Sequence, residues 1–229
     1  MKTYINKIPL FAGAVLVGLF AATSLPAADQ MTRLDARSGS KVRMEGTSTL
    51  HDWQSESPLV MGYIEVGPNF PLDPGQAATP GKVEAHGEAT IMVRQLRSIE
   101  SDGKTYYSDA MDTKMRELMK MDQYPKIVYK LSELTLKEAP KTKTDPYVFD
   151  SKGELTVSGK TKPISMVVKV LPLDETKGEK RVKITGTTPL KMTDFGIEPN
   201  SIIISKTGDD VTIKFDWVVG KKSAPAAPK

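Results

Sequence analysis

The sequence predicts an all-β protein: one antiparallel barrel or sandwich of about eight strands, with one short α-helix between strands. Two observations support this fold class. Segments of alternating apolar and polar residues, separated by turn residues, recur between residues 42 and 219. A single segment, residues 108–121, instead places its apolar side chains at helical spacing. We find neither an internal repeat nor a second domain in the pattern.

The segment 211–219 is the clearest strand. Val211, Ile213 and Phe215 alternate with polar neighbours, which is the period of two that gives a strand one buried and one solvated face. The residues before it, Thr207–Asp210, read TGDD, a typical turn sequence. Because SIIIS precedes this turn, residues 201–215 are predicted to form a hairpin.

The remaining strands follow from the same alternation. Residues 153–157 and 164–170 are joined by a turn-like segment, so 153–170 is predicted to form another hairpin. Residues 126–136 change phase between Leu131 and Leu134, which indicates a β-bulge or bend. The other predicted strands are residues 42–53, 59–66, 81–96 and 181–192.

The predicted helix has an apolar face and signals at both ends. Met111, Met115, Leu118 and Met119 recur at helical intervals. Ser108 or Asp109 is suited to the N-cap position, and the Tyr124–Pro125 pair ends the segment before the next strand. These methionines either form a packed helix face or, being flexible, contribute to an adaptable apolar lining.

The ends of the chain are predicted to lie outside the folded domain, which spans residues 29–220. Residues 1–28 resemble a secretory signal peptide, with lysines at the start, an apolar run over 8–22 and small residues after it. That run is shorter than the roughly 20 residues of a membrane span, although a retained anchor is the alternative. The tail, residues 221–229, is rich in Ala, Pro and Lys and is predicted to be disordered. We therefore expect a periplasmic protein.

Composition excludes several classes of function. The chain has 32 basic and 28 acidic residues, and without the two lysines of residues 1–28 its net charge is +2. A nearly neutral exported chain without a basic stripe is a poor candidate for nucleic-acid binding. The sequence contains no cysteine, so neither disulfides nor a cysteine nucleophile can occur.

One strand carries unusually little bulk on one face. Val83, Ala85, Gly87, Ala89 and Ile91 alternate along the segment 81–96. A barrel of about eight strands is either filled by side chains or just able to hold one small ligand. If this face points inward, it leaves an apolar cavity. The alternative is close packing of another element against the small residues.

The polar residues of the same strand are the only cluster in the sequence that resembles a set of metal ligands. Glu84, His86 and Glu88 share the opposite face. If that face pointed inward, it would favour an enzyme, or an accessory protein of periplasmic redox or metal chemistry. Their spread of about 13 Å converges poorly on one ion, so we predict no metal site.

The run His51-Asp52-Trp53 is predicted to be neither catalytic nor metal-binding. Adjacent residues on a strand point to opposite faces, so His51 and Asp52 cannot easily pair as a base and its orienting acid. We predict no catalytic residues and no enzyme activity. If the run is extended, His51 and Trp53 share a face, either at the end of the barrel as packing residues or beside the ligand. Phe195, in the turn-like segment 191–199, is expected to pack into the core.

These stretches together resemble the YceI-like family of bacterial lipid-binding proteins. The motifs run in the expected order across nearly the whole predicted domain. They are GTSTLHDW at 46–53, MDTKMRELMKMDQYPKIVYKL at 111–131, GELTVSGKTKPISMVVKV at 153–170, GTTPLKMTDFGIEP at 186–199 and DDVTIKFD at 209–216. The resemblance implies a single eight-stranded antiparallel lipocalin-like barrel with an elongated apolar cavity.

The resemblance also implies a ligand and a location. The expected function is a periplasmic binding or carrier protein for a polyisoprenoid, an isoprenoid quinone or a similar long-chain amphiphile, with no other cofactor. Transient membrane contact and a homodimer are compatible with this function. The predicted ligand-binding residues are His51, Trp53, Ala85, Gly87, Ala89, Tyr129, Phe195 and Phe215.

Overall fold

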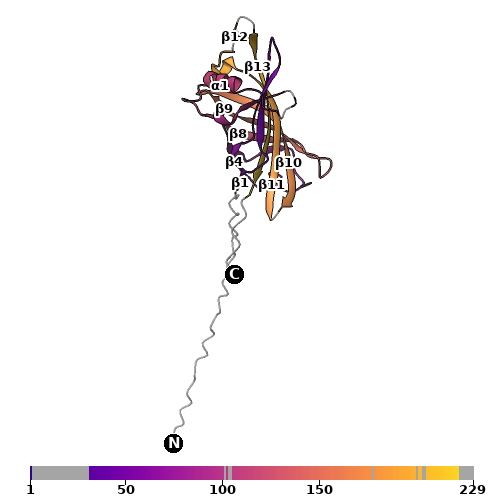
Figure 1. Cartoon of the computed structure of the whole chain (residues 1–229). Coiled ribbons are helices and arrows are strands. Elements are labelled where there is room, and N and C mark those ends of the chain that lie inside the picture. The colour runs from indigo at the N-terminus through magenta and orange to yellow at the C-terminus, as the bar shows by residue number, and fades with distance from the viewer. Residues whose placement is uncertain are drawn as a thin grey trace, which may run out of the picture.

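The computed structural model describes Met1 and residues 31–221, apart from residues 101, 103, 104, 177, 200, 203 and 204. The predicted signal segment, except for its first residue, and residues 222–229 of the predicted tail lie outside the described residues. The described part contains thirteen strands, one α-helix and two 3₁₀ helices (Figure 1). The elements are β1 (Thr32–Ala36), β2 (Lys41–Ser48), β3 (Trp53–Ser57), β4 (Met61–Val66), β5 (Gly81–Val83), β6 (Ala85–Met92), η1 (Val93–Gln95), β7 (Arg97–Ile99), α1 (Asp109–Leu118), β8 (Lys126–Glu138), β9 (Tyr147–Val157), β10 (Lys160–Thr176), β11 (Glu179–Lys191), η2 (Thr193–Phe195), β12 (Ser201–Ile202) and β13 (Ser205–Gly220).

Eight antiparallel strands close into a barrel, as the sequence predicts. The order around the barrel is β1-β4-β6-β8-β9-β10-β11-β13. β1 pairs with β4 on one side and, through Asp35 opposite Gly220, with the end of β13 on the other, which closes the ring. The first strand, β1, and the C-terminal end of the last strand, β13, therefore lie side by side (Figure 1).

The opposite end of the barrel is widened by three additional strands. β13 pairs with β2 from Thr207 to Asp216 and with β1 only at Val219 and Gly220, and β3 and β7 continue the sheet outward from β2. α1 packs beside β7 at this end, where Figure 1 shows it near β12 and the start of β13. This end of the barrel is therefore enclosed by a helix and a short sheet extension.

Local sequence features explain several of these elements. β9 and β10 are joined by a two-residue turn, Ser158-Gly159, in which both residues have positive φ, the requirement of a type I′ hairpin. The predicted bulge is present, because the pairing of β8 with β9 shifts register between Leu131 and Glu133. Ser108 caps α1 by accepting a hydrogen bond from the Met111 amide at 3.3 Å.

The structure corrects four expectations about the strands. Residues 81–96 do not form one strand, because they divide into β5, β6 and η1. Residues 42–53 do not form one strand, because β2 ends at Ser48 and β3 begins at Trp53. Thr207–Asp210 is not a turn: β13 runs through it with a register shift opposite β2. β1 was not predicted. Its five residues are too few to display a clear alternation, and their conformation depends on the partners β4 and β13.

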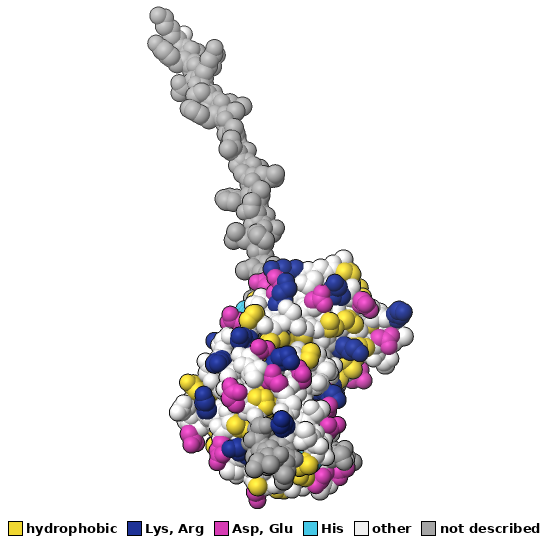
Figure 2. All heavy atoms as spheres, turned by 90° about the horizontal axis from the view of Figure 1, so that it is seen from above, with side chains coloured by type: hydrophobic (Ala, Val, Ile, Leu, Met, Phe, Trp, Pro, Cys, Tyr) yellow, Lys and Arg dark blue, Asp and Glu magenta, His cyan; other side chains and the backbone are white. Residues whose placement is uncertain are grey.

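The barrel interior holds the core, while the outer surface is polar. Phe70 and Phe149 stack with ring centroids 6.0 Å apart, and both are fully buried. Figure 2 shows acidic and basic side chains interspersed over one face of the molecule, without a large area of one sign. This distribution fits the nearly neutral charge expected from the sequence.

Candidate functional site

The barrel interior contains two adjoining apolar cavities of about 220 Å³ and 120 Å³. We call the larger one the helix-side cavity, because α1, β2, β3, η2 and the start of β13 line it. The smaller one, the far cavity, extends toward Phe70 and Trp217. Side chains common to both walls separate the two cavities, namely Val42, Ile91, Leu155, Leu190 and Ile213. The interior thus offers an elongated apolar space.

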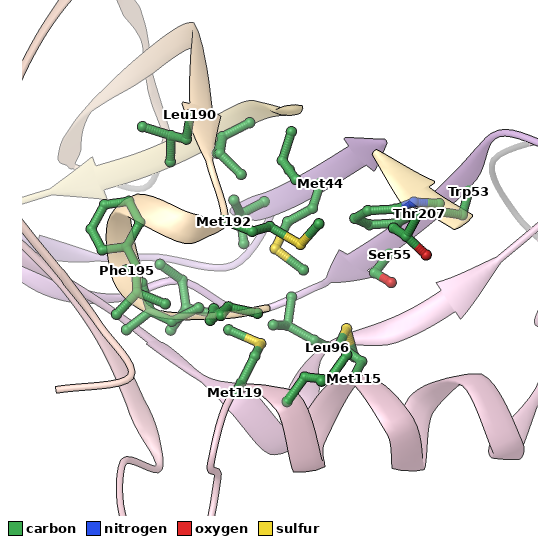
Figure 3. A pocket seen from close by; sticks show the side chains of 18 of the residues that line it. Met44, Trp53, Ser55, Leu96, Met115, Met119, Leu190, Met192, Phe195 and Thr207 are labelled. Atoms are coloured by element: carbon green, nitrogen blue, oxygen red, sulfur yellow. The ribbon is translucent and has the colours of Figure 1, made fainter. Parts of the chain in front are cut away.

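Flexible methionine side chains form part of the helix-side cavity wall (Figure 3). Three methionines come from the α1 segment, one from β2 and one from the residue before η2; they are Met111, Met115, Met119, Met44 and Met192. An unbranched thioether can adopt many shapes at little cost. The predicted apolar face of the helix therefore both packs on the barrel and lines the cavity.

Trp53 lies in the wall of the helix-side cavity because the residue opposite it on β2 is a glycine. Gly46 pairs directly with Trp53 across β2 and β3, and a Cβ atom at position 46 would overlap the indole ring. The indole N–H donates to the Thr47 carbonyl at 3.2 Å. The ring is therefore laid across the hairpin and held there. Phe195, at the end of η2, is buried in the same wall, as expected.

The small-residue strand does face the interior. Gly87 and Ala89 of β6 line the far cavity, whereas Ala85 is buried in the core but lines neither cavity. A Cβ atom at Gly87 would lie 2.8 Å from the Ile64 Cα of β4. Close backbone packing and an unfilled interior, the two alternatives considered from the sequence, thus both occur along this strand.

Tyr129 and Phe215 complete the far cavity. The Tyr129 hydroxyl and the Ser151 hydroxyl are hydrogen-bonded at 2.9 Å. Burial raises the pKa of Tyr129, and the bond to Ser151 opposes this rise only in part. The phenol therefore stays neutral through the physiological range. Phe215 lies against Gly186, where a Cβ atom would come within 2.6 Å of the ring.

A family model described as the YceI-like domain matches residues 30–219. The chain belongs to the YceI-like family. Three solved structures share the fold, and none exceeds 16% identity with this chain. No curated protein sequence matches it.

Each structural comparison covers most of both chains. BcnA of Burkholderia cenocepacia has a TM-score of 0.56 at 16% identity, covering 80% of this chain and 99% of that one. A polyisoprenoid binding domain from Saccharophagus degradans, implicated in plant cell wall breakdown, gives 0.54 at 11% identity, covering 84% and 100%. The Campylobacter jejuni YceI protein gives 0.50 at 13% identity, covering 74% and 85%. Within the described ranges, no helix has the length and apolar character needed to cross a membrane.

In this YceI-like chain His51 does not share a strand face with Trp53, which corrects the prediction. The run between β2 and β3 is a loop, closed by the Ser48 hydroxyl, which donates to the His51 carbonyl at 2.7 Å. His51 is exposed and lines neither cavity. Its ring lies 5.6 Å from that of Tyr107, and its Nε2 is 3.3 Å from the Tyr107 hydroxyl. The alternation of a strand does not apply here because the chain reverses direction.

Replacing His51 with alanine is expected to have little effect on the protein. An exposed loop residue of this kind changes stability by about 0.5 kcal/mol or less, and no cavity contact is lost. Urea unfolding and lipid titration of His51→Ala test this, with Trp53→Leu as the variant that should weaken binding. A clear loss of lipid affinity in His51→Ala would show that the bound molecule reaches the loop.

His86 of β6 lies outside both cavity walls, whereas Glu88 is among the residues that line the far cavity. His86 is exposed, and its Nε2 lies 2.6 Å from Glu65 Oε2. Glu88 pairs in register with Tyr63, whose ring lies 3.7 Å below the Arg33 guanidinium on the outer face. Among the described residues, no group of three or more His, Cys, Asp or Glu side chains could hold a metal ion.

An acid that sequence reasoning missed holds α1 over the helix-side cavity. Asp112 is 1% exposed and accepts a hydrogen bond from the Ser98 amide of β7 at 2.6 Å. Its other oxygen lies 3.4 Å from Arg116 and 3.5 Å from Arg97. Its helical spacing could have revealed this role, because Asp112 shares the buried helical face with Met115 and Met119.

The predicted site residues therefore divide into two groups. His51 and Ala85 lie outside the cavity walls. The other six line a cavity, and they are Trp53, Gly87, Ala89, Tyr129, Phe195 and Phe215. The sequence did not reveal that the α1 methionines belong to the same wall as Trp53, because these residues meet only when the barrel has closed.

Proposed function

We propose that this YceI-like chain is a periplasmic binding protein that carries or stores a long apolar lipid in its barrel, such as a polyisoprenoid or an isoprenoid quinone. The observation that carries the proposal is the pair of adjoining apolar cavities along the barrel interior. The lipid occupies both cavities after the shared side chains move apart. It is held as a bound ligand, without a resident cofactor or catalytic group.

The physical basis is the burial of hydrocarbon. Each CH₂ group removed from water contributes about 0.8 kcal/mol, so a chain of several isoprene units can bind without many polar contacts. Association and ordering of the chain consume part of this gain. Methionine side chains reduce that cost because they adapt to the branched shape of an isoprenoid.

Two further observations support this assignment. The structural neighbour from Saccharophagus degradans, which shares this fold, is a polyisoprenoid binding domain. The apolar segment at residues 8–22 supports export. Such an insoluble lipid is expected to be exchanged during transient contact with a membrane.

The decisive experiment is native mass spectrometry of protein purified from the periplasm, followed by organic extraction. We expect an added mass of several hundred daltons, and an extract with isoprenoid fragments. Protein boiled in organic solvent and refolded provides the lipid-free reference. A lipid-free mass, together with no uptake of added polyprenol or quinone, would contradict the proposal.

A further inference from the structure

Ser55 is a buried polar residue without a partner in the wall of the helix-side cavity. Its side chain is fully buried, and its Oγ has no hydrogen-bond partner among the described residues. It lies two residues along β3 from Trp53, on the same face. A buried hydroxyl without a hydrogen bond costs free energy, and such groups are rare enough to require an explanation.

Neighbouring serines of the same sheet show that the fold can satisfy hydroxyl groups here. Ser57, two residues further along β3, donates to the Leu59 carbonyl at 3.0 Å. Ser98 of β7, the register partner of Ser55, donates to the Ser108 carbonyl at 3.0 Å. Both are as deeply buried as Ser55. Among these three serines, only Ser55 lines the cavity and lacks a partner.

Other polar atoms gather at the same end of the cavity. Figure 3 shows the oxygen atoms of Ser55 and Thr207 at the Trp53 end, and Phe195 and Leu190 at the opposite end. The Trp53 end can therefore accept an oxygen-bearing group, whereas the remaining wall suits hydrocarbon. Because a serine hydroxyl turns about one bond, it can point to a ligand and either donate or accept.

The charges around this cavity do not favour an anion. Two lysines belong to its wall, and both are paired with acids: Lys191 Nζ lies 2.7 Å from Asp210, and Lys114 Nζ lies 3.4 Å from Glu117. The hydrogen bond to Asp210 is the main cause of the raised pKa of Lys191. An anionic head group would have to compete with these carboxylates.

We infer that Ser55 selects lipids with an uncharged oxygen-bearing head group, a hydroxyl or a quinone carbonyl, which it binds at the Trp53 end of the helix-side cavity. This inference rests on the proposed function. The hydrocarbon chain then passes the shared side chains and enters the far cavity. Prenyl phosphates are disfavoured, because no unpaired cation faces the head group in the described wall.

In a competing arrangement, the lipid binds in the opposite orientation, with its head group in the far cavity. Trp217 Nε1 is also buried and without a partner among the described residues, and it lies in the wall of that cavity. An indole N–H donates only, and the far cavity is the smaller of the two. A ring-shaped head group therefore fits the helix-side cavity better. A Trp217→Phe variant separates the two orientations.

The test is a titration of delipidated full-length mature protein, followed by tryptophan fluorescence or by ligand-induced mass shift. The probes share a C20 isoprenoid chain: geranylgeraniol, a quinone with four isoprene units, geranylgeranyl phosphate and the saturated hydrocarbon phytane. Wild-type protein is expected to bind the alcohol and the quinone about 3- to 10-fold more tightly than phytane. The phosphate should bind more weakly than the alcohol.

Ser55→Ala should remove the preference for the alcohol and the quinone while leaving the affinity for phytane unchanged. The stability of the lipid-free variant should not fall, because the lost hydroxyl had no partner. Ser55→Cys, which replaces the hydroxyl with a weakly hydrogen-bonding thiol, serves if the alanine variant folds poorly. Ser57→Ala is the matched control: it loses a satisfied hydrogen bond, so its stability should fall but its lipid preference should not change.

The outcomes separate this inference from the proposed function. An unchanged preference in Ser55→Ala, loss of the preference only in Trp217→Phe, or tighter binding of the phosphate than of the alcohol would each overturn the role of Ser55. In all three cases the protein would still be a lipid-binding protein. If wild-type protein binds none of the four probes, the proposed function fails as well.

Discussion

Replacing Ala89 with phenylalanine is expected to abolish most of the lipid binding without unfolding the barrel. Ala89 lines the far cavity, and its register partner on β4 is Gly62, which has no side chain to obstruct a phenyl ring. The ring would displace about four chain carbons at about 0.8 kcal/mol each, which corresponds to roughly a hundredfold loss of affinity. The free energy of unfolding should change by less than about 1.5 kcal/mol, because the new side chain fills existing space.

The measurement is a lipid titration followed by the two tryptophans, one in the wall of each cavity. Val167→Phe is the control: Val167 lies on β10 and is 53% exposed, so the same side chain is added outside the barrel. Binding should be unchanged in the control. Wild-type affinity in Ala89→Phe would show that the lipid does not enter the far cavity and would shorten the proposed site to the helix-side cavity.

Replacing Asp112 with alanine is expected to cause the largest loss of stability among the variants considered. The substitution leaves the Ser98 amide without its acceptor and removes one carboxylate that pairs with Arg116 and Arg97. Loss of one member of a buried charged network costs about 3 kcal/mol. Urea unfolding measures this loss. Because α1 covers the helix-side cavity, lipid should also dissociate faster from the folded variant.

Two further variants make this prediction specific. Asp109 lies in the same first turn of α1, but its side chain is 92% exposed, so Asp109→Ala should cost no more than about 1 kcal/mol. Asp112→Asn keeps the acceptor for the Ser98 amide and removes only the charge, so its stability should fall between those of the wild type and Asp112→Ala. Equal stability of the Asp112→Ala and Asp109→Ala variants would rule out the anchoring role.

Much of the fold could be predicted because it depends on neighbours in the chain. The alternation in residues 211–219 identified the inward face of β13, and the phase change after Leu131 located the bulge of β8. Ser108 was a recognisable N-cap because its side chain bonds an amide three residues later. The small side chains on one face of residues 83–91 indicated that the barrel interior is not completely filled.

Local patterns were misleading where the chain turns or where a distant partner decides its conformation. Residues 49–52 continue the apolar and polar alternation of β2, yet they form the loop that exposes His51. Thr207–Asp210 has the composition of a turn, but pairing with β2 and β11 keeps the segment extended. β1 could be identified only in the structure, where it pairs with both β4 and β13.

The sequence alone therefore determined the fold class, the helix and its cap, and the strand face that leaves room inside the barrel, because these depend on residues close together in the chain. Only the tertiary structure decided which side chains share a cavity. It brought the α1 methionines to Trp53, placed Asp112 on Ser98 and left the Ser55 hydroxyl without a partner. These contacts join segments far apart in the chain, and a cavity exists only when the side chains of all surrounding strands together fail to fill the enclosed volume.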